Sequence, residues 1–335
     1  MYTVLVVDDV VENIECLTGL LKADYHIKAA TNGKTALKVA QKTLPDIILL
    51  DIMMPEMDGY EVCTALKKNP VTKSIPVIFV TAKDQAVDEV SGFETGAVDY
   101  INKPINPAIT KARIKTQIAL SDQKKALEIQ VAEKTKEINE TRLEIIRKLG
   151  RAAEYKDNDT GLHVERMSRY AYLIAKAYGL NEHLSELLLN ASPMHDIGKI
   201  GVPDTILKKP GALNSEEWLL MAEHTRIGGQ IIGESKSELL SMAKIVAEQH
   251  HERWNGKGYP EQLKKTEINL FARLTAIADV FDALTSKRPY KEAWAMEDAV
   301  AYIKNEKGGH FDPKGVDAFM AALPEILEIK NKFPE

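Results

Sequence analysis

The chain has 335 residues and a net charge of −5, and 28% of its residues are charged. This length suffices for two ordinary domains, and the acidic balance argues against a general nucleic-acid or membrane-surface binder, which would carry a basic surface. No run approaches about eighteen consecutive apolar residues, and the first residues lack the features of a signal peptide. The two cysteines, Cys16 and Cys63, do not make a disulfide framework, so we expect a cytoplasmic protein.

Short apolar runs alternate with helical patterns over the first 105 residues. Completely apolar runs are typical of strands with both faces buried, as in a parallel sheet. The segments 34–42 and 59–68 between them have helical spacing. We therefore predict a doubly wound α/β domain whose ligands bind at the carboxyl ends of the strands. The predicted strands are residues 3–7, 27–30, 46–50, 77–80 and 100–101.

Side chains suited to metal and phosphate chemistry follow these strands. Asp8 and Asp9 end the first strand, Asp51 the third, Thr81 the fourth and Lys103 the fifth. Carboxylates gathered at one edge would bind Mg²⁺, which prefers oxygen ligands and keeps waters for phosphate. An acid beside that ion can accept a phosphoryl group, with the ammonium of Lys103 pairing with the phosphoryl oxygens and Thr81 donating a hydrogen bond to them.

The motifs VDD, DIMMPEMDG, TA and KP in this region resemble the receiver domain of two-component response regulators, over about residues 1–120. The resemblance implies that a cognate sensor histidine kinase phosphorylates Asp51 and that Thr81 and Tyr100 form a switch pair. It also implies that Lys103 binds the phosphoryl group. The implied Mg²⁺ ligands are Asp8, Asp9, Asp51 and the backbone carbonyl of Met53.

A segment without proline or glycine runs from residue 108 to residue 149 and carries charges of both signs. Apolar residues recur there at three-, four- and seven-residue spacings, interrupted by Lys124, Lys134 and Thr141. We predict a long helix that continues the last receiver helix and, over residues 121–146, pairs with a second copy as an imperfect coiled coil. The alternative is a single amphipathic helix packed on its own domain. The seam residues are Leu120, Leu127, Val131, Ile138, Ile145 and Leu149.

Strand patterns are absent from about residue 150 onward. Helical patterns cover residues 163–178, 182–190, 215–228, 238–251 and 270–284, punctuated by prolines and glycines. We therefore predict an all-α domain over residues 147–335.

Metal-ligand residue types are concentrated in this second half, which holds five of the eight histidines of the chain in one candidate set. Imidazole and carboxylate donors without thiolates suit Fe, Mn or Zn. No single spacing is a known zinc motif, so the signal lies in the combination, above all in one adjacent His-Asp and one adjacent His-His pair. The candidate ligands are Asp159, His163, His195, Asp196, His224, His250, His251 and Asp279.

The spacing of these residues favours two neighbouring ions. Neighbouring side chains on a helix diverge by about 100°, so the pair His195-Asp196 suits a carboxylate that bridges two ions beside an imidazole that binds one. If residues 159–163 are helical, Asp159 and His163 share one face. Two ions would acidify a water and hold phosphodiester oxygens, although binuclear sites also serve oxygenases and peptidases.

The motifs HDIGK (195–199), HHERWNGKGYP (250–260) and GGHFDP (308–313), with the stretch 276–294, resemble the HD-GYP family of metal-dependent phosphohydrolases. The resemblance implies hydrolysis of cyclic di-GMP to pGpG, with further cleavage to GMP left open. It implies two divalent ions, Fe or Mn with Zn and Ni as alternatives. A third ion is left open, because Asp159 stands where some members have the longer Glu. Asp196 and Lys199 are the implied catalytic residues, and Tyr259, Arg288 and Lys291 the substrate contacts.

Two features keep alternatives open. Asn255 and Lys257 depart from the residues common in the GYP loop, which leaves a phosphodiesterase for another dinucleotide as a rival. A second rival is an adaptor that binds the dinucleotide, or a diguanylate cyclase with a GGDEF domain, without turnover. A DNA-binding regulator is disfavoured, because no helix-turn-helix or basic domain follows the receiver. We expect a homodimer in which phosphorylation controls the phosphodiesterase.

Overall fold

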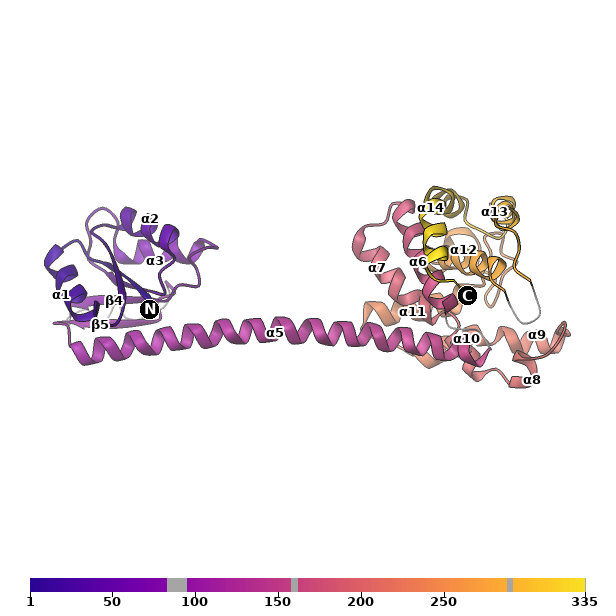
Figure 1. Cartoon of the computed structure of the whole chain (residues 1–335), viewed down its shortest axis with the longest axis horizontal. Helices are drawn as coiled ribbons and strands as arrows, with labels where there is room; N and C mark the ends of the chain where they lie inside the picture. The colour runs from indigo at the N-terminus through magenta and orange to yellow at the C-terminus, as the bar shows by residue number, and fades with distance from the viewer. Residues whose placement is uncertain (83–94, 158–161, 288–291, 335) are drawn as a thin grey trace. The chain divides into compact units, whose positions relative to one another are not determined.

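The computed structural model describes residues 1–82, 95–157, 162–287 and 292–334 and forms two compact units, Met1–Thr135 and Lys136–Glu335 (Figure 1). The predicted residues Asp159, Arg288 and Lys291 lie outside the described residues. Within the described ranges, the structure has no helix that combines the length and apolarity needed to span a bilayer.

The first unit contains a sheet of five parallel strands in the order β2-β1-β3-β4-β5. The chain runs outward from β1 to β2 and then crosses to β3, so the strand order reverses between β1 and β3. This reversal opens a crevice at the carboxyl ends of the strands. The predicted doubly wound α/β fold is confirmed. The strands are β1 (Thr3–Val7), β2 (His26–Ala30), β3 (Ile47–Asp51), β4 (Val77–Ala82) and β5 (Asp99–Lys103).

Helices cover both faces of this sheet (Figure 1). Helices α2 (Gly33–Thr43) and α3 (Gly59–Lys68) pack on one face, and α1 (Val11–Leu21) packs on the other. The first turns of α5 (Pro107–Lys156) join α1 there, because Ile114 and Ile118 are buried against the strands. Burial of both faces explains why the strands read as unbroken apolar runs.

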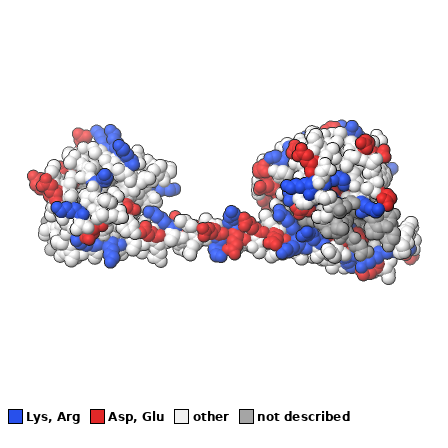
Figure 2. Space-filling view, in the orientation of Figure 1, with Lys and Arg blue, Asp and Glu red and all other residues white. Residues whose placement is uncertain are grey.

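Helix α5 is continuous over 50 residues, which confirms the predicted long helix. Charged side chains of both signs are spread along its middle turns (Figure 2). The apolar residues of the predicted seam are nevertheless exposed, at 58% for Leu127, 57% for Val131 and 51% for Ile138. Such a stripe has no partner within the described chain, which argues against packing of these turns on their own domain.

The second unit is helical, as predicted. Its core is centred on α6 (Leu162–Tyr178), which packs against α7 (Glu182–Ala191), α12 (Leu270–Thr285) and α14 (Pro313–Lys332). The predicted helix 215–228 is wrong in one respect, because the chain forms two helices that meet at Glu223. Helix α10 (His224–Ile232) packs so closely on the segment after Asp196 that a Cβ at Gly198 would lie 1.8 Å from the carbonyl oxygen of His224. Local periodicity does not show a contact between segments so far apart in the sequence.

The helices of this unit are α6 (Leu162–Tyr178), α7 (Glu182–Ala191), α8 (Asp204–Leu207), α9 (Ser215–Ala222), α10 (His224–Ile232), α11 (Glu238–Gln249), α12 (Leu270–Thr285), α13 (Met296–Asn305) and α14 (Pro313–Lys332). Three 3-10 turns accompany them, η1 (Ser192–Met194), η2 (Ile197–Gly201) and η3 (Lys265–Glu267).

Candidate metal centre

An acidic cluster lies at the carboxyl edge of the receiver sheet, where oxygens of Asp8, Asp9 and Asp51 come within 4.8 Å of one another. The ammonium of Lys103 lies 3.0 Å from Asp8 and 3.0 Å from Asp51. Burial and the charge of Asp8 raise the pKa of Asp51 against the opposing effect of Lys103. Several acids held this close need positive charge, so the cluster fits a hard cation such as Mg²⁺ beside the lysine.

The other predicted receiver residues lie on or directly after the strands of the same sheet. Thr81 is buried near the end of β4, where it pairs in register with Asn102, the neighbour of Lys103. Tyr100 is half-buried on β5, and Met53 follows β3 with its side chain exposed. The strand ends therefore bring the hydroxyl of Thr81 to the same edge as Asp51, as the sequence predicts.

The helical unit brings together every predicted ligand that the structure describes. Ligand atoms of Asp196, His224, His250 and His251 lie within 4.8 Å of one another, and we call this set cluster A. Ligand atoms of Glu154, His163 and His195 form a second such group, cluster B. Oδ1 of Asp279 reaches cluster B, 3.3 Å from Nε2 of His163 and 3.9 Å from Nε2 of His195.

The pair His195-Asp196 lies between η1 and η2 and not on an α-helix. Nε2 of His195 is 3.1 Å from Oδ2 of Asp196, so the ends of these two neighbouring side chains lie in contact. The predicted divergence applies to an α-helix, which this segment does not form. Asp196 faces both clusters. Its Oδ2 faces His195 of cluster B, and its Oδ1 lies 3.2 Å from Nε2 of His224 and 3.5 Å from Nε2 of His250 in cluster A.

Backbone carbonyls fix the orientation of three histidine rings. Nδ1 of His195 lies 3.0 Å from the oxygen of Ser192, Nδ1 of His224 lies 2.7 Å from that of Met221, and Nδ1 of His250 lies 3.1 Å from that of Val246. A carbonyl only accepts, so each Nδ1 must carry the proton. A second-sphere hydrogen bond of this kind leaves Nε2 as the metal-binding atom.

These Nε2 atoms face carboxylate oxygens that cannot donate to them. Nε2 of His195, His224 and His250 and Oδ1 of Asp196 are buried and have no hydrogen-bond partner in the described part of the chain. Burial lowers the pKa of His250 and of His251, which keeps those rings neutral. Lone pairs directed at one another across about 3 Å are stable only around positive charge, so the residues fit a centre of divalent cations.

A buried carboxylate behind the cluster orients His163. Oδ2 of Asp282 lies 2.8 Å from Nδ1 of His163, and Asp282 also accepts two hydrogen bonds from Arg166, at 2.7 and 2.8 Å. Burial lowers the pKa of His163, but hydrogen bonds with Asp279 and Asp282 outweigh that effect and raise it well above its usual value. This is the carboxylate–histidine arrangement that supports metal ligands.

Lys199 lies between two acids at the edge of the clusters. Its Nζ is 2.8 Å from Oδ2 of Asp196 and 2.8 Å from Oδ2 of Asp157. Burial lowers the pKa of Lys199, but the charges of Asp196, Glu154 and Asp157 outweigh it and raise the pKa well above its usual value. The side chain is therefore a fixed cation beside cluster A.

Tyr259 covers cluster A from the loop after α11. Its ring stacks on His251, with centroids 4.8 Å apart and an interplanar angle of 24°, and meets the ring of Trp218 edge-on at 5.1 Å. Trp218 is 45% exposed, so the two rings form an aromatic wall between cluster A and solvent.

Comparison with known proteins identifies the family of each unit. A family model described as HD domain matches residues 137–315, and one described as response regulator receiver domain matches residues 4–115. The chain belongs to the response regulators that carry an HD domain. The HD domain implies divalent metal binding, and the receiver domain implies a phosphodonor.

Curated relatives share this organisation. A probable cyclic di-GMP phosphodiesterase of Vibrio cholerae is 39% identical, over 99% of this chain and 80% of that protein. The cyclic di-GMP phosphodiesterase response regulator RpfG of Xanthomonas campestris is 38% identical, over 86% of this chain and 78% of that protein. A 3'3'-cGAMP-specific phosphodiesterase 2 of Vibrio cholerae is 41% identical, over 59% of this chain and 38% of that protein.

Sequence reasoning missed several residues at the centre of this response regulator. Asp282 has a local signal, because it follows Asp279 by three residues on the same face of α12, where most residues are apolar. Glu154 and Asp157 have a weaker one, because they stand at the end of a highly charged helix where most acids are exposed. Arg166 and Trp218 are recognised only from the contacts that the fold creates.

Proposed function

We propose that this response regulator hydrolyses cyclic di-GMP to the linear dinucleotide pGpG at the HD metal centre. The observation that carries the proposal is Asp196, whose Oδ2 faces Nε2 of His195 and whose Oδ1 faces Nε2 of His224 and His250. This geometry suits a carboxylate shared by two ions, and the names of the relatives support the substrate.

The donor set assigns residues to two ions. Cluster A would hold one ion, and His163, His195 and Asp279 the other, with Asp196 between them. Bound divalent ions supply an acidified water and a Lewis acid for the phosphodiester. Nitrogen and oxygen donors without thiolate suit Fe, Mn, Zn and Ni, and the resemblance to the HD-GYP family favours Fe or Mn among them.

The remaining side chains would bind and orient the substrate. Lys199 is charged and fixed by Asp157, so its ammonium would donate to a non-bridging phosphate oxygen as negative charge develops there. Tyr259 and Trp218 present aromatic surface at the entrance, where a guanine base would stack. The predicted contacts Arg288 and Lys291 stay predictions.

A turnover assay on metal-loaded protein tests this function. Anaerobically purified protein loaded with Mn²⁺ or Fe²⁺ is incubated with cyclic di-GMP, and the products are separated by chromatography. We expect pGpG from the wild-type protein and none from Asp196→Ala. Binding of cyclic di-GMP without any linear product would instead identify an adaptor, and capture of a purified GGDEF-domain cyclase would then be tested.

A second substrate is favoured by one relative and one loop. The relative named for 3'3'-cGAMP is 41% identical over 59% of this chain, and Asn255 and Lys257 depart from the residues common in the loop that carries Tyr259. Values of kcat/KM for the two cyclic dinucleotides, measured side by side, decide which one the site prefers. We expect the higher value for cyclic di-GMP.

Phosphorylation of Asp51 by a sensor histidine kinase would set the hydrolysis rate through the linker helix, residues 121–146. This helix would pair with the same helix of a second copy in a homodimer. The exposed apolar seam of α5 supports this assignment. Beryllofluoride, which mimics the phosphoryl group, should change the rate of the wild-type protein. Asp51→Ala should remove that change, and an equal rate with and without beryllofluoride in the wild type would refute the coupling.

A further inference from the structure

Glu154 is an acid that the proposed reaction does not use. It lies near the end of α5, only 1% exposed, and its Oε1 is buried without a hydrogen-bond partner in the described residues. A carboxylate oxygen is a strong acceptor, and burying an ionised carboxylate without a donor or a cation costs far more free energy than burying a neutral polar group. Its carboxylate lies within 4.8 Å of ring nitrogens of His163 and His195.

The end of α5 is fixed to the turn that carries His195 and Asp196. Gly150 allows the helix to approach so closely that a Cβ there would lie 2.2 Å from the oxygen of Pro193. Ala153 and Ile146 pack with Met194 and Ile197 on both sides of the pair. Further along, Lys156 donates hydrogen bonds to the carbonyl oxygens of Ile200 and Val202, at 2.7 and 2.6 Å.

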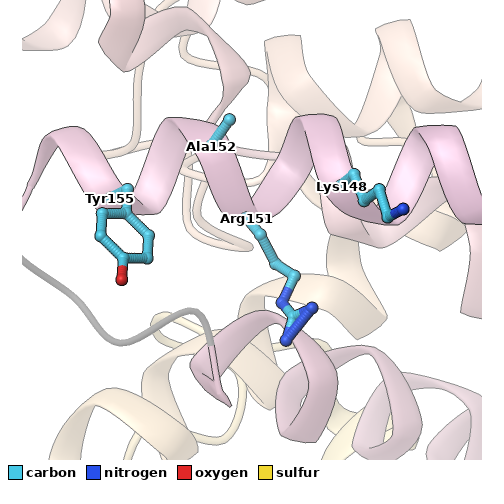
Figure 3. A pocket seen from close by; sticks show the side chains of 4 residues that line it. All are labelled: Lys148, Arg151, Ala152 and Tyr155. Atoms are coloured by element: carbon cyan, nitrogen blue, oxygen red, sulfur yellow. The ribbon is translucent and has the colours of Figure 1, made fainter.

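The opposite face of the same turns looks outward. Lys148, Arg151, Ala152 and Tyr155 all lie on α5 and line an open surface pocket of about 580 Å³ (Figure 3). Tyr155, the neighbour of Glu154, is 75% exposed. A helix turns by about 100° per residue, so Gly150, Ala153 and Glu154 form one inward stripe and the pocket residues form another. The inward position of Glu154 therefore follows from the orientation of the whole helix.

We propose that Glu154 is a metal ligand supplied by α5, which completes the site of His163, His195 and Asp279. The inference rests on the metal centre of the proposed function and adds a donor from the helix that also supplies Ile114 and Ile118 to the receiver core. A displacement of the last turns of α5 would move a ligand directly. The metal affinity of the HD domain thereby depends on the position of this helix.

The rival explanation is that Glu154 only balances the charge of protonated histidines. Under that explanation, removal of the carboxylate would leave the metal affinity unchanged. Metal titration therefore distinguishes the two, independently of hydrolysis.

The test uses the full chain, freed of metal by a chelator, and titrates Mn²⁺ by calorimetry and Co²⁺ by visible absorption. Glu154→Gln keeps the shape of the side chain and removes its charge. The control is Glu144→Gln, the same change on the same helix at a side chain that is 63% exposed and paired with Lys148. Melting temperatures of the metal-free proteins check folding. If Glu154→Gln does not fold, Glu154→Asp, which keeps the charge but shortens the reach, replaces it.

We expect Glu154→Gln to weaken one site about tenfold or more and to change the Co²⁺ spectrum, while Glu144→Gln titrates as the wild type does. Affinities that stay within about threefold of wild type at every site, with an unchanged spectrum, would overturn the inference. A wild-type protein that binds metal but does not hydrolyse cyclic di-GMP would refute the proposed function and leave this inference intact.

Discussion

Nζ of Lys199 lies 2.8 Å from Oδ2 of Asp196, the same oxygen that lies 3.1 Å from Nε2 of His195. The lysine thus contacts the carboxylate that faces both clusters. Its charge lies directly beside this carboxylate, and a second acid, Asp157, holds it there at 2.8 Å. Removal of this cation should therefore affect the chemical step more than metal binding.

Lys199→Ala should lower kcat by about 100- to 1000-fold, the usual effect of losing one fixed donor to developing negative charge. The metal content, measured by elemental analysis, should stay at the wild-type level. The control is Lys209→Ala, because Lys209 also pairs with an acid, Glu217, but lies outside the clusters. Loss of metal in step with activity would show that Lys199 holds Asp196 in place and does not serve the substrate.

Asp282→Asn should reduce both stability and metal affinity. The change removes the charge that balances the buried Arg166, and breaking a buried ion pair costs about 3–5 kcal/mol in free energy of unfolding. It also replaces the acceptor that fixes the ring of His163, for which a loss of about 10- to 100-fold in metal affinity is typical. Urea denaturation in the presence of a chelator measures the first effect, and Mn²⁺ titration measures the second.

The matched control for this change is Asp317→Asn. Asp317 is 66% exposed on the surface of α14 and pairs with Lys307. The free energy of unfolding of the Asp317→Asn protein should differ from that of the wild type by less than about 0.5 kcal/mol. Equal effects of the two substitutions would show that the buried contacts of Asp282 contribute no more to stability and metal binding than a surface ion pair does.

Local pattern was enough to predict most of the fold. Burial on both faces made the receiver strands unbroken apolar runs, and the absence of proline and glycine predicted α5. The division between α9 and α10 escaped, because the contact of Gly198 with His224 that fixes it joins residues 26 positions apart. Periodicity reports only the face of an element, not the distant segment that bends it.

The candidate site shows the same limit. The His-Asp and His-His pairs pointed to candidate ligands whose ligand atoms do lie close together in the structure. Their geometry was less predictable, since His195 and Asp196 converge through 3-10 turns. Glu154 was not recognised because its surroundings in the sequence are those of a solvated helix, and only the packing of Gly150 against Pro193 turns that face inward.

Removal of metal should destabilise the second unit. Without a cation, Nε2 of His195, His224 and His250 and Oδ1 of Asp196 are left buried without partners. An ion present at about 100 times its dissociation constant would stabilise the folded state by about 2.7 kcal/mol. A chelator should therefore lower the melting temperature, and Mn²⁺ in excess should restore it.

Two histidine variants make this experiment specific. In His250→Ala the shift in melting temperature between chelator and Mn²⁺ should shrink, because a ligand is gone. In His183→Ala it should equal that of the wild type, because His183 is exposed and pairs with Glu238 away from both clusters. A metal-dependent shift that survives unchanged in His250→Ala would mean that the stabilising ion binds elsewhere.

The seam of α5 makes a separate prediction about assembly. Val131 and Ile138 lie seven residues apart and are 57% and 51% exposed, as expected for positions that meet a second helix in a coiled coil. Charges at both positions would be buried in that interface without partners. The double variant Val131→Glu, Ile138→Glu should therefore sediment at the monomer mass of 37.3 kDa at concentrations where the wild type is a dimer.

Ile129→Glu is the matched control, because Ile129 is 59% exposed on the opposite side of the helix and its substitution should leave the dimer intact. A wild-type chain that is itself monomeric in sedimentation equilibrium, or a double variant that stays dimeric, would exclude this seam as the interface.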